Sequence, residues 1–255
     1  MSNATTFERH VLVTGASRGI GERLAARFAR EGARLTLCGR DPETISAAAA
    51  RIPGSVGIAA DVTDETSVEQ LFAQAREAHG PVSVVIANAG GSESAPISRT
   101  TIDAWNATLA VNLTGVFLCF RAGLADMQEQ SWGRLICIAS TAGLKGYGYV
   151  TPYCAAKHGA VGLTRSLALE LAKTPITVNA ICPGFTETPM LTESIQRIVD
   201  TTGRSEEQAR TSLRRINPQD RFIDPDEIAD TAHWLCSDAA RSITGQALAV
   251  AGGEV

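Results

Sequence analysis

Two side chains in the second half of the chain are spaced so that one can alter the proton affinity of the other. Tyr153 and Lys157 are separated by one helical turn in a segment of helical character that starts near Pro152. This spacing places both side chains on one helix face. A phenol is a poor base at neutral pH, and a neighbouring ammonium favours its ionised form. The pair is suited to exchanging a proton with a substrate oxygen, although a lone Y-x-x-x-K is more often an ordinary surface pair.

A hydroxyl that could hold the same oxygen lies upstream. Ser140 follows an apolar run, residues 135–139, that is typical of a strand. Open α/β sheets bind their ligands at the carboxyl ends of the strands. A hydroxyl there could donate to a substrate oxygen as negative charge develops on it. A serine at a strand end is unremarkable alone, so its significance depends on the other motifs.

The first apolar run leads into a glycine-rich turn. Residues 14–21 read TGASRGIG and precede a segment of helical character. Glycines let the backbone turn tightly and approach a pyrophosphate, and a helix N-terminus offers free N–H groups to it. The spacing G-x-x-x-G-x-G differs from the common G-x-G-x-x-G, and a purely structural turn is the alternative. The residues predicted to bind a dinucleotide here are Gly15, Ser17, Arg18, Gly19, Ile20 and Gly21.

The end of the second apolar run favours NADP(H) over NAD(H). NAD enzymes usually place an acid here for the ribose 2′-OH, but Cys38 and Gly39 cannot serve. Arg40 and Arg18 could instead pair with a 2′-phosphate. Asp41 complicates this assignment, unless it caps the helix that begins after it. Both arginines could also be merely solvated. NADP(H) is the favoured cofactor, and NAD(H) remains open.

Seven short apolar runs alternate with longer segments of helical character. The runs are 10–14, 34–38, 55–60, 82–87, 134–139, 177–181 and 247–250, and the helical segments include 22–31, 67–78, 102–125, 152–172 and 225–237. Strands that alternate with helices predict βαβ units and a parallel sheet covered on both faces. We therefore predict an α/β fold: a single-domain, Rossmann-type, doubly wound sheet of about seven strands over residues 1–255.

One segment does not fit this pattern. Residues 189–221 are polar, charged and too long for a plain connection between two late strands. A mobile substrate lid and a solvated helical hairpin are both consistent with this composition.

The composition excludes several other functions. The net charge is −4 without a run of Lys and Arg, so neither nucleic acid nor a membrane is an expected partner. No signal-peptide pattern occurs in residues 1–10, and no apolar run approaches the roughly 18 residues that span a bilayer. The six cysteines form no C-x-x-C pair, which favours reduced thiols, no metal site and a cytoplasmic protein.

Taken together, these residues resemble the short-chain dehydrogenase/reductase family over nearly the whole chain. The motifs that carry the resemblance are residues 14–21, Asp61-Val62, Asn88-Ala89-Gly90, Asn112, Ser140, Tyr153-x-x-x-Lys157 and Pro183-Gly184. Ala87 is a departure, because many members have a second asparagine there. Asn88 itself is present, so the departure should matter little.

The resemblance implies an NAD(P)-dependent oxidoreductase with a catalytic tetrad of Asn112, Ser140, Tyr153 and Lys157. In such enzymes the tyrosine carries the proton, the serine holds the substrate oxygen, and the lysine binds the nicotinamide ribose. Asn112 would bend its helix and hold a water of the proton relay. The further cofactor residues implied are Asp61, Val62, Asn88, Ala89, Gly90, Pro183, Gly184, Thr186 and Thr188. Members commonly form tetramers or dimers through the helices around Asn112 and Tyr153.

Within the family, residues 176–190 are most similar to bacterial ketoreductases. A 3-oxoacyl thioester or an aromatic or cyclic ketone is therefore the expected substrate. Residues 92–97, 142–150 and the 189–221 segment would select it, with Tyr147, Tyr149, Phe185, Met190 and Leu191 as apolar candidates whose alternative role is packing. Other possibilities are an NAD-dependent secondary-alcohol or 3-hydroxyacyl dehydrogenase, a non-catalytic dinucleotide-binding protein, and an elimination or epimerisation enzyme of the same fold.

Overall fold

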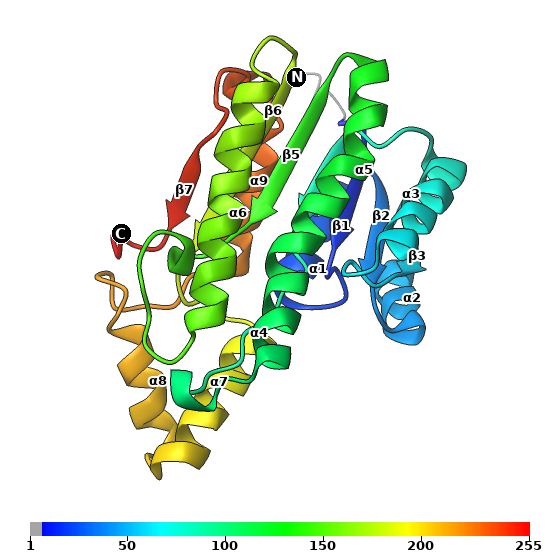
Figure 1. Cartoon of the computed structure of the whole chain (residues 1–255). Coiled ribbons are helices and arrows are strands. Elements are labelled where there is room, and N and C mark those ends of the chain that lie inside the picture. The colour runs from blue at the N-terminus through cyan, green and yellow to red at the C-terminus, as the bar shows by residue number, and fades with distance from the viewer. Residues whose placement is uncertain (1–6) are drawn as a thin grey trace, which may run out of the picture.

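The computed structural model describes residues 7–255 and contains one parallel seven-stranded sheet (Figure 1). The strands are β1 (His10–Thr14), β2 (Arg34–Gly39), β3 (Ser55–Ala59), β4 (Val84–Ala87), β5 (Gly133–Ile138), β6 (Ile176–Pro183) and β7 (Ala247–Val250). Their order in the sheet is β3-β2-β1-β4-β5-β6-β7. The predicted doubly wound sheet is confirmed. Residues 1–6, part of the predicted domain and of the segment searched for a signal peptide, lie outside the described residues.

Helices cover both faces of the sheet. They are α1 (Gly19–Arg30), α2 (Pro42–Ala50), α3 (Glu65–His79), α4 (Ile102–Leu109), α5 (Gly115–Gln130), α6 (Thr151–Glu170), α7 (Pro189–Thr202), α8 (Glu206–Arg214) and α9 (Pro225–Leu235). At the start of α9, Asp224 and Glu227 form a capping box around Pro225.

Alternating side chains on the strands build two separate cores. On β1, Leu12 packs in the core shared with α3, α5 and α6, whereas Val11 and Val13 pack in the core shared with α1, α2 and α9. Successive side chains of a strand point to opposite faces, so a strand buried on both sides needs a continuous apolar run. Each fully buried side chain of this size contributes roughly 1.5–3 kcal/mol to folding. Hence both helical layers are fixed relative to the sheet.

The sheet reverses its order between β1 and β4. β1 pairs with β2 on one side and with β4 on the other. Because the connections after β1 and β4 leave toward opposite edges of the sheet, a crevice opens outside their carboxyl ends. In Figure 1 the strand arrows point toward the end of the molecule where α7 and α8 lie.

The 189–221 segment forms a helical hairpin at this end. α7 ends at Thr202 and is capped by Gly203, which has a left-handed φ of +69°, and α8 begins with a capping box of Ser205 and Gln208. The two helices enclose a small core of their own, formed by Leu191, Ile195 and Ala209. Leu191 therefore has the packing role that was its alternative. Movement of the hairpin stays a prediction.

One helical segment is apolar enough to pass a compositional test for a membrane span, although polar residues interrupt its apolar runs. The continuous helical segment Ile102–Gln130 is long and apolar enough, by length and composition alone, to cross a membrane, with a mean hydropathy of 1.5 in its most apolar window. Its α5 part lies on β4 and β5, where Val116, Cys119 and Phe120 enter the core. An apolar, amphipathic helix on a sheet passes the same compositional test as a membrane span, because both bury non-polar side chains.

A histidine is fully buried at the amino end of β1. His10 Nδ1 donates to the carbonyl of Gly80 (2.8 Å), which leaves Nε2 to accept from the hydroxyl of Thr36 (2.9 Å) in the neutral ring. Burial is the main reason that the pKa of His10 falls to about 4, and the nearby His79 and Arg34 lower it further.

We expect acid to destabilise the protein through this histidine. The unfolded state takes up a proton near pH 6.5 and the folded state only near pH 4, so the contribution is complete above pH 6.5 and is lost as the pH falls toward 4. The loss should approach about 3 kcal/mol in the free energy of unfolding. Urea denaturation across this pH range measures it. An equal pH dependence in His10→Gln would contradict the assignment.

Candidate active site

The turn after β1 has a conformation that requires glycine. Gly15 and Gly19 have φ angles of +63° and +59°. The Asn88 side chain, just after β4, donates to the carbonyls of Thr14 (2.9 Å) and Gly15 (3.1 Å). A Cβ atom on Gly21 would lie 2.7 Å from the same amide nitrogen. The turn is therefore lined by backbone and opens onto the N-terminus of α1, an arrangement that fits a pyrophosphate.

The opposite wall of the crevice forms where β6 ends. Pro183 is the last residue of β6, and the chain then runs through Gly184 to the start of α7. The Thr186 hydroxyl donates to the Gly184 carbonyl (2.9 Å), and the Thr188 hydroxyl donates to the Thr186 carbonyl (3.2 Å). A Cβ on Gly19 would lie 3.4 Å from Thr188 Cγ2. The two predicted groups of cofactor residues thus face each other.

The end of β2 leaves one arginine without a hydrogen bond or salt bridge, although its charge acts on the nearby Asp61. The carboxylate of Asp41 caps α2 by accepting from the Thr44 N–H (2.7 Å), and this hydrogen bond lowers the pKa of Asp41. Arg40 is exposed, and its guanidinium has no hydrogen-bond or ion-pair partner among residues 7–255. Asp61 accepts from the N–H of Thr63 (2.9 Å), the main cause of its lowered pKa. Asp41 therefore has the capping role that would leave Arg40 for a phosphate.

Arg18 has a different partner from the one predicted. Its Nη1 lies 2.8 Å from Glu193 Oε1 on α7, with both side chains more than half exposed. Such an exposed pair contributes at most about 1 kcal/mol to stability, so Arg18 can exchange Glu193 for another anion. Of the other predicted cofactor residues, Ser17 lies in the turn and Ile20 in the first turn of α1. Val62 follows β3, and Ala89 and Gly90 follow β4.

Lys157 is held next to Tyr153 on the inner face of α6. Its side chain is buried, and Nζ donates to the carbonyl of Ile138 at the end of β5 (2.9 Å). Nζ lies 5.5 Å from the centroid of the Tyr153 ring. The Tyr153 hydroxyl has no hydrogen-bond partner within the described part of the chain. The ammonium is thus fixed and the phenol is left to act on another molecule.

Asn112 lies in a π-turn, Ala110–Thr114, that interrupts the helix between α4 and α5. Its Nδ2 donates to the carbonyls of Gly91 (2.8 Å) and Thr108 (3.0 Å). A Cβ on Gly90 would lie 2.7 Å from Asn112 Oδ1 and 3.6 Å from Lys157 Nζ. Gly90 is therefore the point at which Asn112 and the lysine approach one another, and only a residue without a side chain fits between them.

Ser140 follows β5 and caps a short 3-10 turn, Thr141–Gly143. Its Oγ accepts from the N–H of Ala142 (3.1 Å), which leaves the hydroxyl proton free to donate. Ile138, which binds the lysine, is only two positions earlier in the chain. The tetrad residues are thus brought to the same edge of the sheet.

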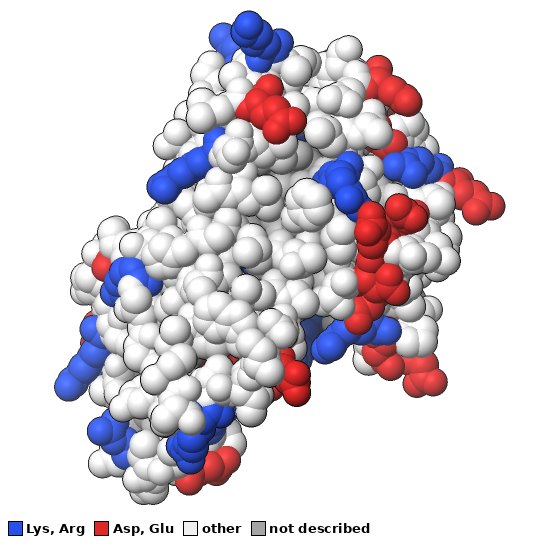
Figure 2. All heavy atoms as spheres, viewed as in Figure 1, with Lys and Arg blue, Asp and Glu red and all other residues white. Residues whose placement is uncertain are grey.

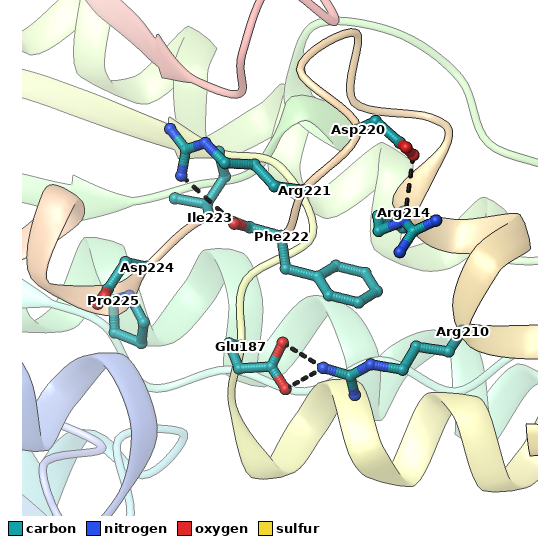
Figure 3. Close-up of a pocket in the computed structure, with 9 residues that line it drawn as sticks. All are labelled: Glu187, Arg210, Arg214, Asp220, Arg221, Phe222, Ile223, Asp224 and Pro225. Carbon is teal, nitrogen blue, oxygen red and sulfur yellow. Dashed lines mark hydrogen bonds and ion pairs between the residues drawn. The ribbon is translucent and has the colours of Figure 1, made fainter. Parts of the chain in front are cut away.

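Two pockets among the described residues lie away from the tetrad, on the 187–225 region. One, of about 530 Å³, surrounds Phe222 and is lined by three arginines (Figure 3). Glu187 binds Arg210 through both carboxylate oxygens (2.6 and 2.7 Å), and Asp220 binds Arg214 (3.1 Å). Since the arginines are neutralised by acids, ion pairing within the hairpin explains this pocket without a ligand. The other, of about 730 Å³, lies along α7.

Comparisons with known proteins agree with the geometry. The family described as short chain dehydrogenase matches residues 9–198. The chain belongs to the short-chain dehydrogenase family. It is an NAD(P)-dependent oxidoreductase, as expected from the sequence.

Individual relatives of this short-chain dehydrogenase include ketoreductases. It is 39% identical to the granaticin polyketide synthase putative ketoacyl reductase 1 of Streptomyces violaceoruber, over 95% of this chain and 91% of the relative. It is 35% identical to the D-beta-hydroxybutyrate dehydrogenase of Cupriavidus necator, over 96% of each. The crystal structure of an actinorhodin polyketide ketoreductase variant with NADPH matches with a TM-score of 0.93 and 36% identity, over 100% of this chain and 99% of that chain.

Sequence reasoning missed one polar group in this short-chain dehydrogenase. Glu254 contacts Tyr147 although 107 residues separate them along the chain. No local motif marks a contact between segments so far apart.

We expect Gly21→Ala to weaken binding of the nicotinamide cofactor. The new methyl group would collide with the Asn88 side chain and the backbone of Gly15, and overpacking of this kind costs about 1–3 kcal/mol, or roughly tenfold to a hundredfold in Kd. Cofactor fluorescence titration measures the change. Gly146→Ala is the control, because nothing lies within 4 Å of its Cβ position. Equal affinities of both variants would contradict the role of the turn.

Proposed function

We propose that this short-chain dehydrogenase reduces a ketone to a secondary alcohol, with Tyr153 as the proton donor. The observation that carries the proposal is the buried Lys157 ammonium, fixed to Ile138 and 5.5 Å from the Tyr153 ring, beside a cradle of glycines. A positive charge in that position stabilises the phenolate that remains after proton donation.

The residues divide the proton chemistry between them. The Ser140 hydroxyl donates to the ketone oxygen and supports the charge that develops there. Tyr153 transfers its proton to this oxygen as general acid, and Lys157 stabilises the resulting phenolate. The cofactor supplies the hydride when it is bound, and the glycine turn and the end of β6 would hold it. In alcohol oxidation the same groups act in reverse, with Tyr153 as general base.

Asn112 has a supporting part in this mechanism. Its amide joins the π-turn to Gly91, and its oxygen lies at the Gly90 position close to Lys157. We infer that it maintains the bend and, with a bound water, returns protons to the lysine side of the site.

NADP(H) is the cofactor that we propose. Arg40 makes no hydrogen bond or salt bridge within residues 7–255, Asp41 is occupied as a helix cap, and the pair of Arg18 with Glu193 is exposed and exchangeable. Two arginines could therefore contact a 2′-phosphate. The actinorhodin relative was solved with NADPH, and a 3-ketoacyl-(acyl-carrier-protein) reductase of Brucella melitensis, 30% identical, was solved with NADH.

A 3-oxoacyl thioester or a cyclic or aromatic ketone is the substrate class that we propose. The names of the ketoacyl-reductase relatives support it, and so does the exposure of Tyr149 (68%) and Met190 (42%), apolar side chains from two predicted substrate segments. The α7–α8 hairpin would cover the substrate as a lid. Its packing core is separate from the two cores of the sheet, so it can move without disturbing them.

We also propose a homodimer or homotetramer in the cytoplasm. Phe117 on α5 and Leu169 on α6 are 42% and 80% exposed, and Figure 2 shows that the centre of the face formed by these helices is largely uncharged. Covering this face with a second copy would bury both side chains. All six cysteines are free thiols, which is typical of a reducing compartment.

We expect Tyr153→Phe to lower kcat for ketone reduction by about a hundredfold to ten-thousandfold, because it removes the transferred proton and leaves the ring in place. NADPH affinity should stay unchanged. Steady-state kinetics and cofactor titration measure the two quantities. Ser46→Ala, which removes an exposed hydroxyl on α2, is the control. Wild-type turnover in Tyr153→Phe would refute the proposed mechanism.

We expect Arg40→Asp to shift the preference from NADPH toward NADH. The substitution removes a cation from the proposed 2′-phosphate site and adds an acid that can bind a ribose hydroxyl, so the ratio of kcat/KM for the two cofactors should fall by roughly tenfold to a hundredfold. Arg241→Asp changes the charge equally, at the opposite edge of the sheet. If both variants keep the wild-type ratio, Arg40 has no part in cofactor selection.

A further inference from the structure

A carboxylate is buried next to the predicted substrate loop. The Glu254 side chain, after β7, is only 1% exposed. Its Oε1 lies 3.0 Å from Lys145 Nζ and accepts a hydrogen bond from the Tyr147 hydroxyl. Thr141 Oγ1 lies 2.6 Å from the same phenol oxygen. Because the single phenol proton goes to Glu254, the hydroxyl of Thr141 donates to Tyr147.

This cluster joins two walls of the site. Thr141 directly follows Ser140 in the loop after β5. The Tyr147 ring stands edge-on to Phe185, with centroids 6.1 Å apart and planes at 89°. A Cβ on Gly184 would lie 3.1 Å from Glu254 Oε2, so the carboxylate reaches beneath the end of β6. Glu254 is thus in contact with both segments that flank the proposed ketone.

The cost of burying this carboxylate indicates that it has a function. Oε2 has no hydrogen-bond partner within residues 7–255, although it is inaccessible to solvent. A buried acceptor without a partner is unfavourable, and a buried carboxylate is tolerated only when other groups compensate it. Here the compensation comes from Lys145 and Tyr147. Burial and the Glu254 carboxylate both raise the pKa of Tyr147, so its phenol stays neutral and keeps its proton for the hydrogen bond.

The two tyrosines of this loop contrast with each other. Tyr149 is 68% exposed and has a left-handed φ of +68°, which is unusual for a bulky residue. Tyr147 instead contacts the side chains of Thr141, Glu254 and Phe185. Gly146 and Gly148 flank Tyr147 and have nothing within 4 Å of their Cβ positions, so no packed neighbour holds the loop at these two residues.

We propose that Glu254 is a positioning residue for the ketone: it holds the Tyr147 ring against Phe185, and this aromatic pair forms one wall of the site for an apolar, ring-bearing substrate. The proposal rests on the proposed ketone reduction. Glu254 does not touch the reacting atoms, and it acts through Tyr147.

The kinetic test is a double-mutant cycle of Glu254→Gln and Tyr147→Phe with a cyclic or aryl ketone. Each single variant should raise the ketone KM about tenfold, the effect of losing one charge-assisted hydrogen bond. The double variant should be no worse than either, because both remove the same contact. The kcat and the Kd for NADPH should stay near wild type, and Glu69→Gln, at an exposed glutamate on α3, is the control.

Three kinetic results would overturn the proposal. They are an unchanged ketone KM in Glu254→Gln, effects of the two substitutions that multiply, and a parallel rise in the Kd for NADPH. If Glu254→Gln does not fold, as judged by circular dichroism, Tyr147→Phe alone decides, and an unchanged KM in that variant is the contrary result.

An optical measurement separates this proposal from the proposed function. The alkaline absorbance change of the wild type minus that of Tyr147→Phe reports the ionisation of Tyr147 alone. In Glu254→Gln this ionisation should move to lower pH, because the repulsion by the carboxylate is gone. If it does not move, Glu254 does not hold the phenol. If it moves but the wild type reduces no ketone, the network stands and the proposed function fails.

Discussion

A buried ammonium must have an acceptor, and in this protein the acceptor comes from the sheet. Lys157 Nζ donates to the Ile138 carbonyl, where β5 ends, so the inner face of α6 is tied to that strand end. The same bond sets the position of Tyr153, one turn away on the helix, and of Ser140, just beyond the strand. Gly90 completes the arrangement, because a side chain there would collide with Asn112. A shift of α6 along the sheet would therefore separate all of these groups.

The two apolar layers are what keep this contact in place. Residues of β5 alternate between the core under α5 and α6 and the core under α1 and α9. Neither layer can slide without exposing large side chains to water. The carboxyl ends of β1, β4, β5 and β6 consequently meet along one edge, where the glycine turn, Asn88 and the predicted tetrad lie.

The walls of the site are built differently from its floor. The floor comes from strand ends with fixed spacing, whereas the walls come from segments that are distant in sequence. The α7–α8 hairpin has its own small core, and it contacts the glycine turn through the exposed pair of Arg18 and Glu193. Glu254 reaches the loop of Tyr147 from beyond β7. Under the proposed function, substrate selection could thus change in this fold without altering the proton chemistry.

The sequence by itself determined the alternation of strands and helices, the glycine turn and the spacing of Tyr153 and Lys157, because these depend on local periodicity and local backbone geometry. It also predicted a helix over residues 102–125, but its composition alone does not distinguish a helix on a sheet from a membrane span. Only the tertiary structure decided that Asp41 serves as a cap, that Leu191 packs within the hairpin, and that Glu254 lies beneath the substrate loop. Contacts of this kind join segments whose separation along the chain carries no periodic signal, so they arise only when the strands have paired.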